Sequence, residues 1–246
     1  MKSFAAWLFI ALTIASSPCE AGLVYVTLGN SGTLATASLT NTFTTTTNAC
    51  PAGSLIILWA NYESTSDAPS SVTDSAGNTY QTPIDNIAGS GIGIGIVYAK
   101  NTSANLPVGG TITATFAGSV TSRVGASCVT GASQTAPLDT HNNSANGTAA
   151  TSATSVNTGT LENTNEIVFG VFAASANLGS EACNGSYSNK VAGTAVPAIN
   201  VCEQIVTSKS SLAFSPSWGN SVNYVSDILS FQAPFPSLMF TPAIVP

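Results

Sequence analysis

Carboxylates are the side chains in this sequence best suited to hydrolysis, but none are spaced as a catalytic pair. Retaining glycosidases hold two carboxylates roughly 5–5.5 Å apart, and a single strand would place such a pair two positions apart on one face. No two of the 11 Asp and Glu residues have that spacing. Glu162 and Glu166 lie four positions apart across a predicted turn. We therefore predict a non-catalytic protein. The alternative is a hydrolase in which Asp139, Glu166 or Asp227 would carry the activity.

His141 is the only histidine, so a Ser-His-Asp triad would have to use it. It lies in the polar stretch 139–143, without the G-x-S-x-G turn that exposes a nucleophilic serine. The cysteines have no C-x-x-C spacing, so the sequence carries no zinc signature. We interpret His141 as a solvated loop residue and expect no resident cofactor.

Calcium is the one metal that the loops could hold, since it binds carboxylate and amide oxygens. The candidate ligands are Asp74 and Asn78 in one loop and Asp139 in another. Neither loop has the EF-hand spacing. Asp and Asn also stabilise turns through their own side chains, and this structural interpretation is the alternative at both loops.

Aromatic side chains offer a different chemistry, because sugars stack on exposed rings. Trp218, in the turn-like stretch 215–220, is the best candidate, with Asn220, Tyr80 and Tyr187 as companions. The alternative is that Trp218 covers the edge of the core. Trp59 lies in an apolar run and is expected to be buried.

These side chains must be positioned by strands, because period-2 alternation recurs along the chain and helical periodicity does not. Residues 54–61 form a nearly continuous apolar run, typical of a central strand. In 110–118, apolar residues alternate with threonine. Residues 71–82 are expected to form a hairpin around the turn at 74–78. Glycines at 93 and 95 leave one face of a strand bare, so a neighbouring segment or a ligand should pack there.

About ten to twelve short antiparallel strands with one apolar face imply two sheets packed face to face. The stretch 140–159 is expected to be a long loop or, in part, an exposed strand. The predicted fold is an all-β, two-sheet antiparallel sandwich, with jelly-roll-like architecture. Its predicted core is Leu58, Ile112, Phe116, Ile167, Phe169, Val171, Leu229 and Phe231.

The ends of the chain differ from the rest. Residues 1–21 read as a secretory signal peptide, with Lys2 before an apolar run too short to span a membrane. Cleavage after Ala21 leaves four of the five cysteines, an even number that suggests two disulfides in an exported chain. We favour Cys183–Cys202 and Cys50–Cys128. Free thiols are the alternative.

Charge is scarce: 7% of residues are charged and the formal net charge is −6. Clustered Lys and Arg are absent, which excludes a nucleic-acid binder. Residues 22–232 are assigned to the sandwich and residues 233–246 to an apolar, proline-punctuated tail without charge. Phe235, Leu238, Phe240 and Ile244 would form a hydrophobic patch if left in water. The tail is expected to pack on its own domain or on a neighbouring subunit.

Several stretches in order resemble a group of bacterial extracellular β-sandwich domains over roughly residues 50–232. They are SVTDSAGNTY at 71–80, YAKN at 98–101, the strand GTITATFAGS that starts at 110, APLD at 136–139 and NEIVFG at 165–170. The resemblance implies a jelly-roll-like sandwich at the cell surface or outside the cell. It implies no activity. The four cysteines and the apolar tail depart from the group's usual pattern.

Two functional hypotheses follow. The first is a secreted adhesion module that binds an extracellular glycan or another surface partner. The second is a structural subunit of a filament or surface layer that self-associates through the tail. Both place the mature chain outside the cell, with no transmembrane segment after signal cleavage.

Overall fold

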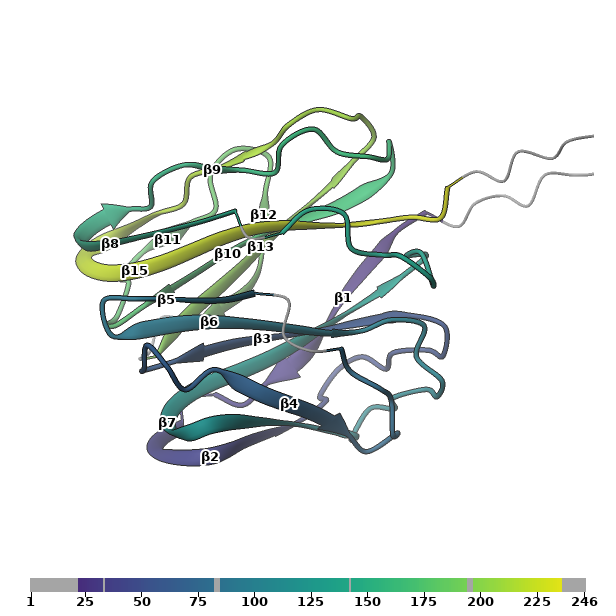
Figure 1. Cartoon of the computed structure of the whole chain (residues 1–246), viewed down its shortest axis with the longest axis horizontal. Coiled ribbons are helices and arrows are strands. Elements are labelled where there is room, and N and C mark those ends of the chain that lie inside the picture. Colours follow the sequence, from purple (N-terminus) through teal and green to yellow (C-terminus); the bar gives the residue numbers. More distant parts are fainter. Residues whose placement is uncertain (1–21, 33, 82–84, 142, 194–196, 236–246) are drawn as a thin grey trace, which may run out of the picture.

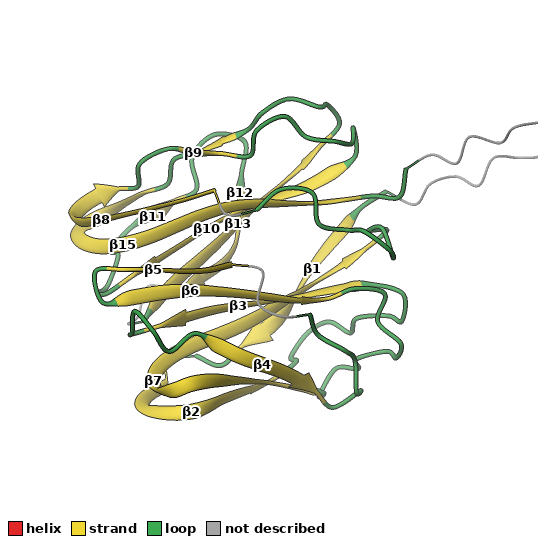
Figure 2. Ribbon diagram, in the orientation of Figure 1, coloured by secondary structure: helices red, strands yellow, loops and turns green. Residues whose placement is uncertain are grey.

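The structure, a computed structural model, describes residues 22–32, 34–81, 85–141, 143–193 and 197–235. Within these ranges, all regular structure is β-strand, and the strands form antiparallel sheets packed against each other (Figures 1 and 2). The predicted all-β sandwich is therefore confirmed. The predicted signal peptide and tail residues Leu238, Phe240 and Ile244 lie outside the described residues.

The first sheet has a central path of five strands and two further strands on its longest member. The path runs β1 (Val24–Asn30), β7 (Thr111–Thr130), β3 (Leu55–Tyr62), β6 (Ile92–Ala99) and β5 (Asp85–Gly89). The strands β2 (Leu34–Thr44) and β4 (Pro69–Asp74) pair with β7. Because β4 pairs with the beginning of β7 and β3 with its end, β7 runs from an outer layer into the main sheet.

The second sheet is built in the same way around β15 (Ser217–Gln232). Its remaining strands are β8 (Asn143–Ser152), β10 (Glu166–Ala174), β11 (Glu181–Ala182), β12 (Ser188–Gly193) and β13 (Ala198–Val206). A separate ribbon pairs β9 (Val156–Asn157) with β14 (Ala213–Phe214). Part of the stretch expected to be a loop is thus the exposed strand β8.

Each half of the chain forms its own sheet, and the two sheets have the same strand order. In the first sheet the order is β1-β7-β3-β6-β5, and in the second β8 lies beside β15, followed by β10, β13 and β12. In the first half, the last strand β7 lies between β1 and β3, and in the second half the last strand β15 lies between β8 and β10. The outermost pair also corresponds, because β5 lies at the edge beside β6 and β12 lies at the edge beside β13. The segment between β7 and β8 connects the two units.

The apolar side chains form three cores rather than the single one predicted. The central core lies between the sheets and contains Trp59, Ile167, Phe169, Val171, Leu229 and Phe231. The first outer core lies between the first sheet and the β2–β4 layer, and the second outer core lies under the β9–β14 ribbon. The predicted core residues are all buried, but Leu58, Ile112 and Phe116 belong to the first outer core.

Of two local predictions, one is confirmed by the structure and the other is wrong. The bare face of β6 is covered by a neighbouring segment, because the ring of Tyr62 packs on Gly93. The predicted hairpin over residues 71–82 is wrong: β4 pairs with β7, and Thr79–Gln81 form no strand. Tyr80 instead turns back and donates a hydrogen bond from its hydroxyl to Asp74 Oδ2 at 2.9 Å.

Two disulfides tie the outer cores, with the pairing favoured from the sequence. Cys50–Cys128 lies in the first outer core and Cys183–Cys202 in the second. All four cysteines are buried. These bonds fit an oxidising extracellular environment.

Candidate functional site

The segment between the two halves, residues 131–140, closes one end of the sandwich. Its backbone pairs with the last residues of β15: the Asp139 N–H donates to Ser230 O at 3.0 Å and the Gln232 N–H to Pro137 O at 2.6 Å. Leu138 and Phe231 form an isolated bridge. We call this the crossover segment. It brings loop side chains against the end of the second sheet, where binding residues are often found.

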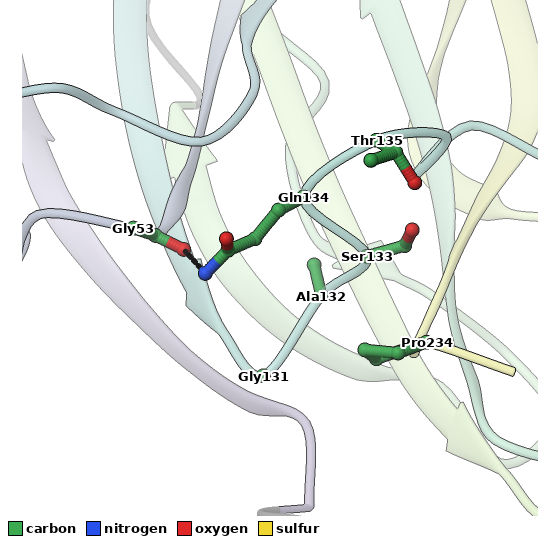
Figure 3. A pocket seen from close by; sticks show the side chains of 7 residues that line it. All are labelled: Gly53, Gly131, Ala132, Ser133, Gln134, Thr135 and Pro234. Carbon is green, nitrogen blue, oxygen red and sulfur yellow. Dashed lines mark hydrogen bonds between the residues drawn. The ribbon is translucent and has the colours of Figure 1, made fainter. Parts of the chain in front are cut away.

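A pocket of about 410 Å³ opens beside the crossover segment (Figure 3). It is lined by Gly53, Gly131, Ala132, Ser133, Gln134, Thr135 and Pro234. The Gln134 side chain spans part of it, donating from Nε2 to Gly53 O at 3.5 Å. The lining residues supply hydroxyl and amide groups but no ionisable side chain. The pocket therefore offers space for a small or apolar group and no acid–base chemistry of its own.

Pro234 connects this pocket to the C-terminal tail. The backbone is held up to Ala233, whose N–H donates to Asn165 O at 3.0 Å. Pro234 forms one wall of the pocket (Figure 3), and Phe235 follows with 55% of its surface exposed. The described chain thus leaves the sandwich at this pocket with an aromatic side chain in solvent.

Asp139, in the crossover segment, is hydrogen-bonded to Glu166, although the two lie far apart in the sequence. Glu166 begins β10 and is fully buried, and its Oε1 accepts a hydrogen bond from the Asn163 N–H at 2.8 Å. Asp139 Oδ2 accepts one from the Glu162 N–H at 3.0 Å. No two acids are spaced as a pair in the sequence, but a tertiary contact joins a loop acid to a strand acid.

Two neutral side chains share this place. Alternate residues of a strand face opposite sides, and Ile228 packs in the second outer core. Ser230 and Gln232 therefore lie on the outer face of β15. On β10, Val168 places Glu166 on the same face. We call Asp139, Glu166, Ser230 and Gln232 the acceptor cluster.

The electrostatics of the acceptor cluster are set by burial and by like charge. Burial, with a smaller contribution from the nearby carboxyl of Asp139, raises the pKa of Glu166 to about 7. The Asn163 N–H and the Ser230 hydroxyl act in the opposite direction by stabilising the carboxylate. A fully buried acid with this pKa can accept a proton or a cation near neutral pH. Neither acid lines the pocket, so the pair does not resemble the accessible dyad of a glycosidase.

Trp218 is not the exposed platform that was expected. Only 5% of its surface is exposed. Its ring stacks on Phe172 with centroids 5.5 Å apart, and its Nε1–H donates to Ala150 O at 2.8 Å. The structure supports the alternative interpretation, in which Trp218 packs at the edge of the core.

The proposed companions of Trp218 do not gather around a common surface. Tyr80 packs against the first outer core and Tyr187 against the second, on opposite outer faces of the sandwich. Tyr187 stacks edge-on against Phe214 with centroids 5.2 Å apart, and burial raises the pKa of its hydroxyl. Asn220 is exposed, and its Nδ2 donates to Asn177 O at 2.9 Å.

The calcium candidates also separate. Asp74 is the centre of a turn: its Oδ1 accepts from the N–H groups of Ala76 and Asn78, and its Oδ2 accepts from Asn78 Nδ2 and Tyr80. With four donors, this carboxylate is satisfied by the protein. Asp139 lies in the crossover segment, in the acceptor cluster. Asp74 and Asn78 are thus explained by the turn alone.

Two further polar residues named in the sequence analysis are at least partly buried. Asp227, a candidate catalytic acid, is fully buried, and its Oδ1 accepts from the Ile228 N–H at 2.9 Å. His141 is half-buried next to the crossover segment. Over the described ranges, no three or more His, Cys, Asp or Glu side chains gather as a metal-binding group. In the same part of the chain, no helix is long and apolar enough to cross a membrane.

Comparison with protein-family models, with curated proteins and with solved structures finds no match to this chain.

Proposed function

We propose that the mature chain is an exported, non-catalytic sandwich subunit that self-associates through its C-terminal end. The observation that carries this proposal is the exit of the chain at Pro234, beside an open pocket, with Phe235 more than half exposed. The segment that follows is apolar and uncharged. Extended apolar surface on a secreted protein favours contact with a partner over contact with water.

The edge of the first sheet adds a second contact surface. β1 is an edge strand, and Val24 near its start is 55% exposed. In Figure 1, the beginning of β1 and the end of β15 lie at the same end of the sandwich. An edge strand presents unpaired backbone groups to which an extended segment can add. The C-terminal tail of one copy would therefore meet both the pocket and the first part of the β1 edge on the next copy. The later part of that edge is occupied, since Thr27 O and Leu28 O accept from Asn48 Nδ2 and the Thr46 N–H.

Burial of Trp218 weakens the glycan hypothesis. The ring that was expected to stack on a sugar is covered by Phe172 and Tyr224. The low charge and the two disulfides support a durable extracellular subunit in either case.

Light scattering across a concentration series tests the proposal. Residues 22–246 are compared with a variant ending at Phe235 and with the point variant Phe235→Ser in the full mature chain. We expect the full chain to form oligomers that grow with concentration and the truncated chain to remain monomeric. The Phe235→Ser variant should dissociate at higher concentrations than the full chain.

A mature chain that stays monomeric at all concentrations would overturn the proposal. So would oligomers of the same size in the truncated variant, because the tail would then play no part. A glycan array with both forms provides the comparison with adhesion: binding by the monomeric truncated form would favour a carbohydrate module.

A further inference from the structure

The acceptor cluster has more hydrogen-bond acceptors than donors. Glu166 Oε2 and Gln232 Oε1 are both buried without a hydrogen-bond partner. Glu166 is fully buried and Gln232 is 2% exposed. A buried oxygen without a partner destabilises the folded state, so two at one place require an explanation.

The two oxygens belong to side chains that lie together. Glu166 and Gln232 are direct register partners on β10 and β15, where side chains on one face have Cβ atoms about 4.5–5.5 Å apart. The Gln232 amide is oriented by its Nε2, which donates to Ala136 O of the crossover segment at 3.2 Å. Its oxygen therefore remains available beside Glu166.

The surrounding groups are also oxygens. The Asp139 carboxyl acts electrostatically on Glu166 from the crossover segment. The hydroxyls of Ser230 and Thr140 lie 3.2 Å apart at the same edge. The charged group that acts on Glu166 is another carboxyl, that of Asp139, to which Glu166 is also hydrogen-bonded. The donors to the pair are the backbone N–H groups of Glu162 and Asn163 and the hydroxyl of Ser230.

We propose that the acceptor cluster is a binding site for a calcium-type divalent cation, with Asp139, Glu166 and Gln232 as the side-chain ligands. Two carboxylates and a carboxamide form an oxygen-only set, which suits Ca²⁺ rather than zinc or copper. A proton on Glu166 would serve one acceptor at a time, whereas a cation can contact the oxygens of all three side chains. Calcium sites of extracellular modules have Kd values on the order of 10⁻⁴–10⁻³ M, and this site has few charged ligands.

The site would join the crossover segment to the second sheet. Asp139 comes from the crossover segment, Glu166 from the start of β10 and Gln232 from the end of β15. A cation held by all three would fix the crossover segment to the second sheet. This inference is independent of the proposed self-association, since neither acid lines the pocket.

Unfolding of the full mature chain at pH 7, followed by intrinsic fluorescence, tests the site. Protein treated with a chelator and dialysed is titrated with CaCl₂, and with NaCl at matched ionic strength. We expect Ca²⁺ to raise Tm progressively with log concentration, with half-saturation of direct binding, measured by calorimetry, near 10⁻⁴–10⁻³ M. NaCl should give no comparable rise.

Three variants and one control locate the effect. Asp139→Asn, Glu166→Gln and Gln232→Leu should each weaken calcium binding by about tenfold or more. Glu162→Gln is the matched control, because its exposed side chain is adjacent to the cluster but only its backbone N–H takes part. It should bind calcium as the unmodified chain does. Asp139→Asn and Gln232→Leu keep the test decisive if Glu166→Gln fails to fold.

Two results would overturn the site. One is the absence of calcium binding, or binding that Asp139→Asn and Gln232→Leu leave unchanged. The other is a proton in place of the cation: Tm would then be insensitive to calcium but would fall as pH rises from 5 to 7, and Glu166→Gln would remove that slope.

Discussion

The aromatic ring of Tyr62 lies directly on the backbone of Gly93 in the neighbouring strand β6. Tyr62 and Gly93 are register partners, and a methyl group added at Gly93 would overlap the ring. The same arrangement recurs in the second half, where Phe214 covers Gly170 of β10. In each half, a glycine in an inner strand thus lets an aromatic ring approach the sheet and fill an outer core.

Gly93→Ala should destabilise the fold, because the ring of Tyr62 is fully buried and has no room to move away. We expect a loss of about 1–3 kcal/mol in the free energy of unfolding, as for other overpacked cores. Urea denaturation measures it. Gly22→Ala is the control, since an added methyl there meets no neighbour.

A double-mutant cycle with Tyr62→Ala isolates the contact. In the Tyr62→Ala background, Gly93→Ala should cost less by at least about 0.5 kcal/mol. An unchanged cost would show that the alanine acts through the backbone and not through the ring.

The two disulfides should differ in their contribution to stability. Cys50–Cys128 spans 78 residues and Cys183–Cys202 spans 19. Chain entropy predicts losses of about 4.5 and about 3 kcal/mol when each pair is replaced by alanine. Chemical denaturation of the two double variants measures the difference. Equal losses, or a larger loss for the shorter loop, would contradict an effect on the unfolded chain.

Trp218 should behave as a structural residue. Trp218→Ala should lower the free energy of unfolding by about 3–5 kcal/mol, as for other buried large-to-small changes. Trp218→Phe keeps the stack on Phe172 but leaves Ala150 O without its donor, and should cost about 1–3 kcal/mol. Urea denaturation of both variants gives the values. A Trp218→Ala variant that keeps its stability but loses binding to a sugar would restore the glycan interpretation.

Buried tyrosines should make the fold sensitive to alkali. Burial raises the pKa of Tyr62 to about 12 and that of Tyr80 further, with Asp74 adding to the effect at Tyr80. A raised pKa means that the folded state holds its proton while the unfolded state loses it above pH 10. Stability is thus complete below pH 10 and falls as pH rises beyond it, by up to about 1.4 kcal/mol per pH unit for each such group.

Denaturation midpoints measured between pH 9 and 11.5 give this slope. Tyr80→Phe removes one titrating group and should make the decline shallower, while its loss of the bond to Asp74 lowers stability at neutral pH. A decline of the same steepness in Tyr80→Phe would assign the alkaline effect to other groups.

Local patterns in the sequence predicted several of the strands and their buried sides, but not β2, β5 or β12. In 111–116, threonine alternates with Ile112, Ala114 and Phe116, and the structure buries those three. The run 54–61 is a central strand, as its continuous apolar character predicted. The disulfide pairing followed from cysteine count and loop composition. The strand order that the two halves share was not predicted, although both halves contain one central apolar run and end on a long strand.

What the sequence by itself determined was which residues avoid water, because alternation and composition are local properties of the chain. What covers them was decided only by the tertiary structure. The turn-like sequence around Trp218 suggested exposure, but Phe172 and Tyr224 from distant strands enclose its ring. Asp139 and Glu166 look isolated along the chain, yet the crossover segment pairs with the end of β15 and brings them together. Contacts of this kind depend on strand order and register, which a local pattern does not encode.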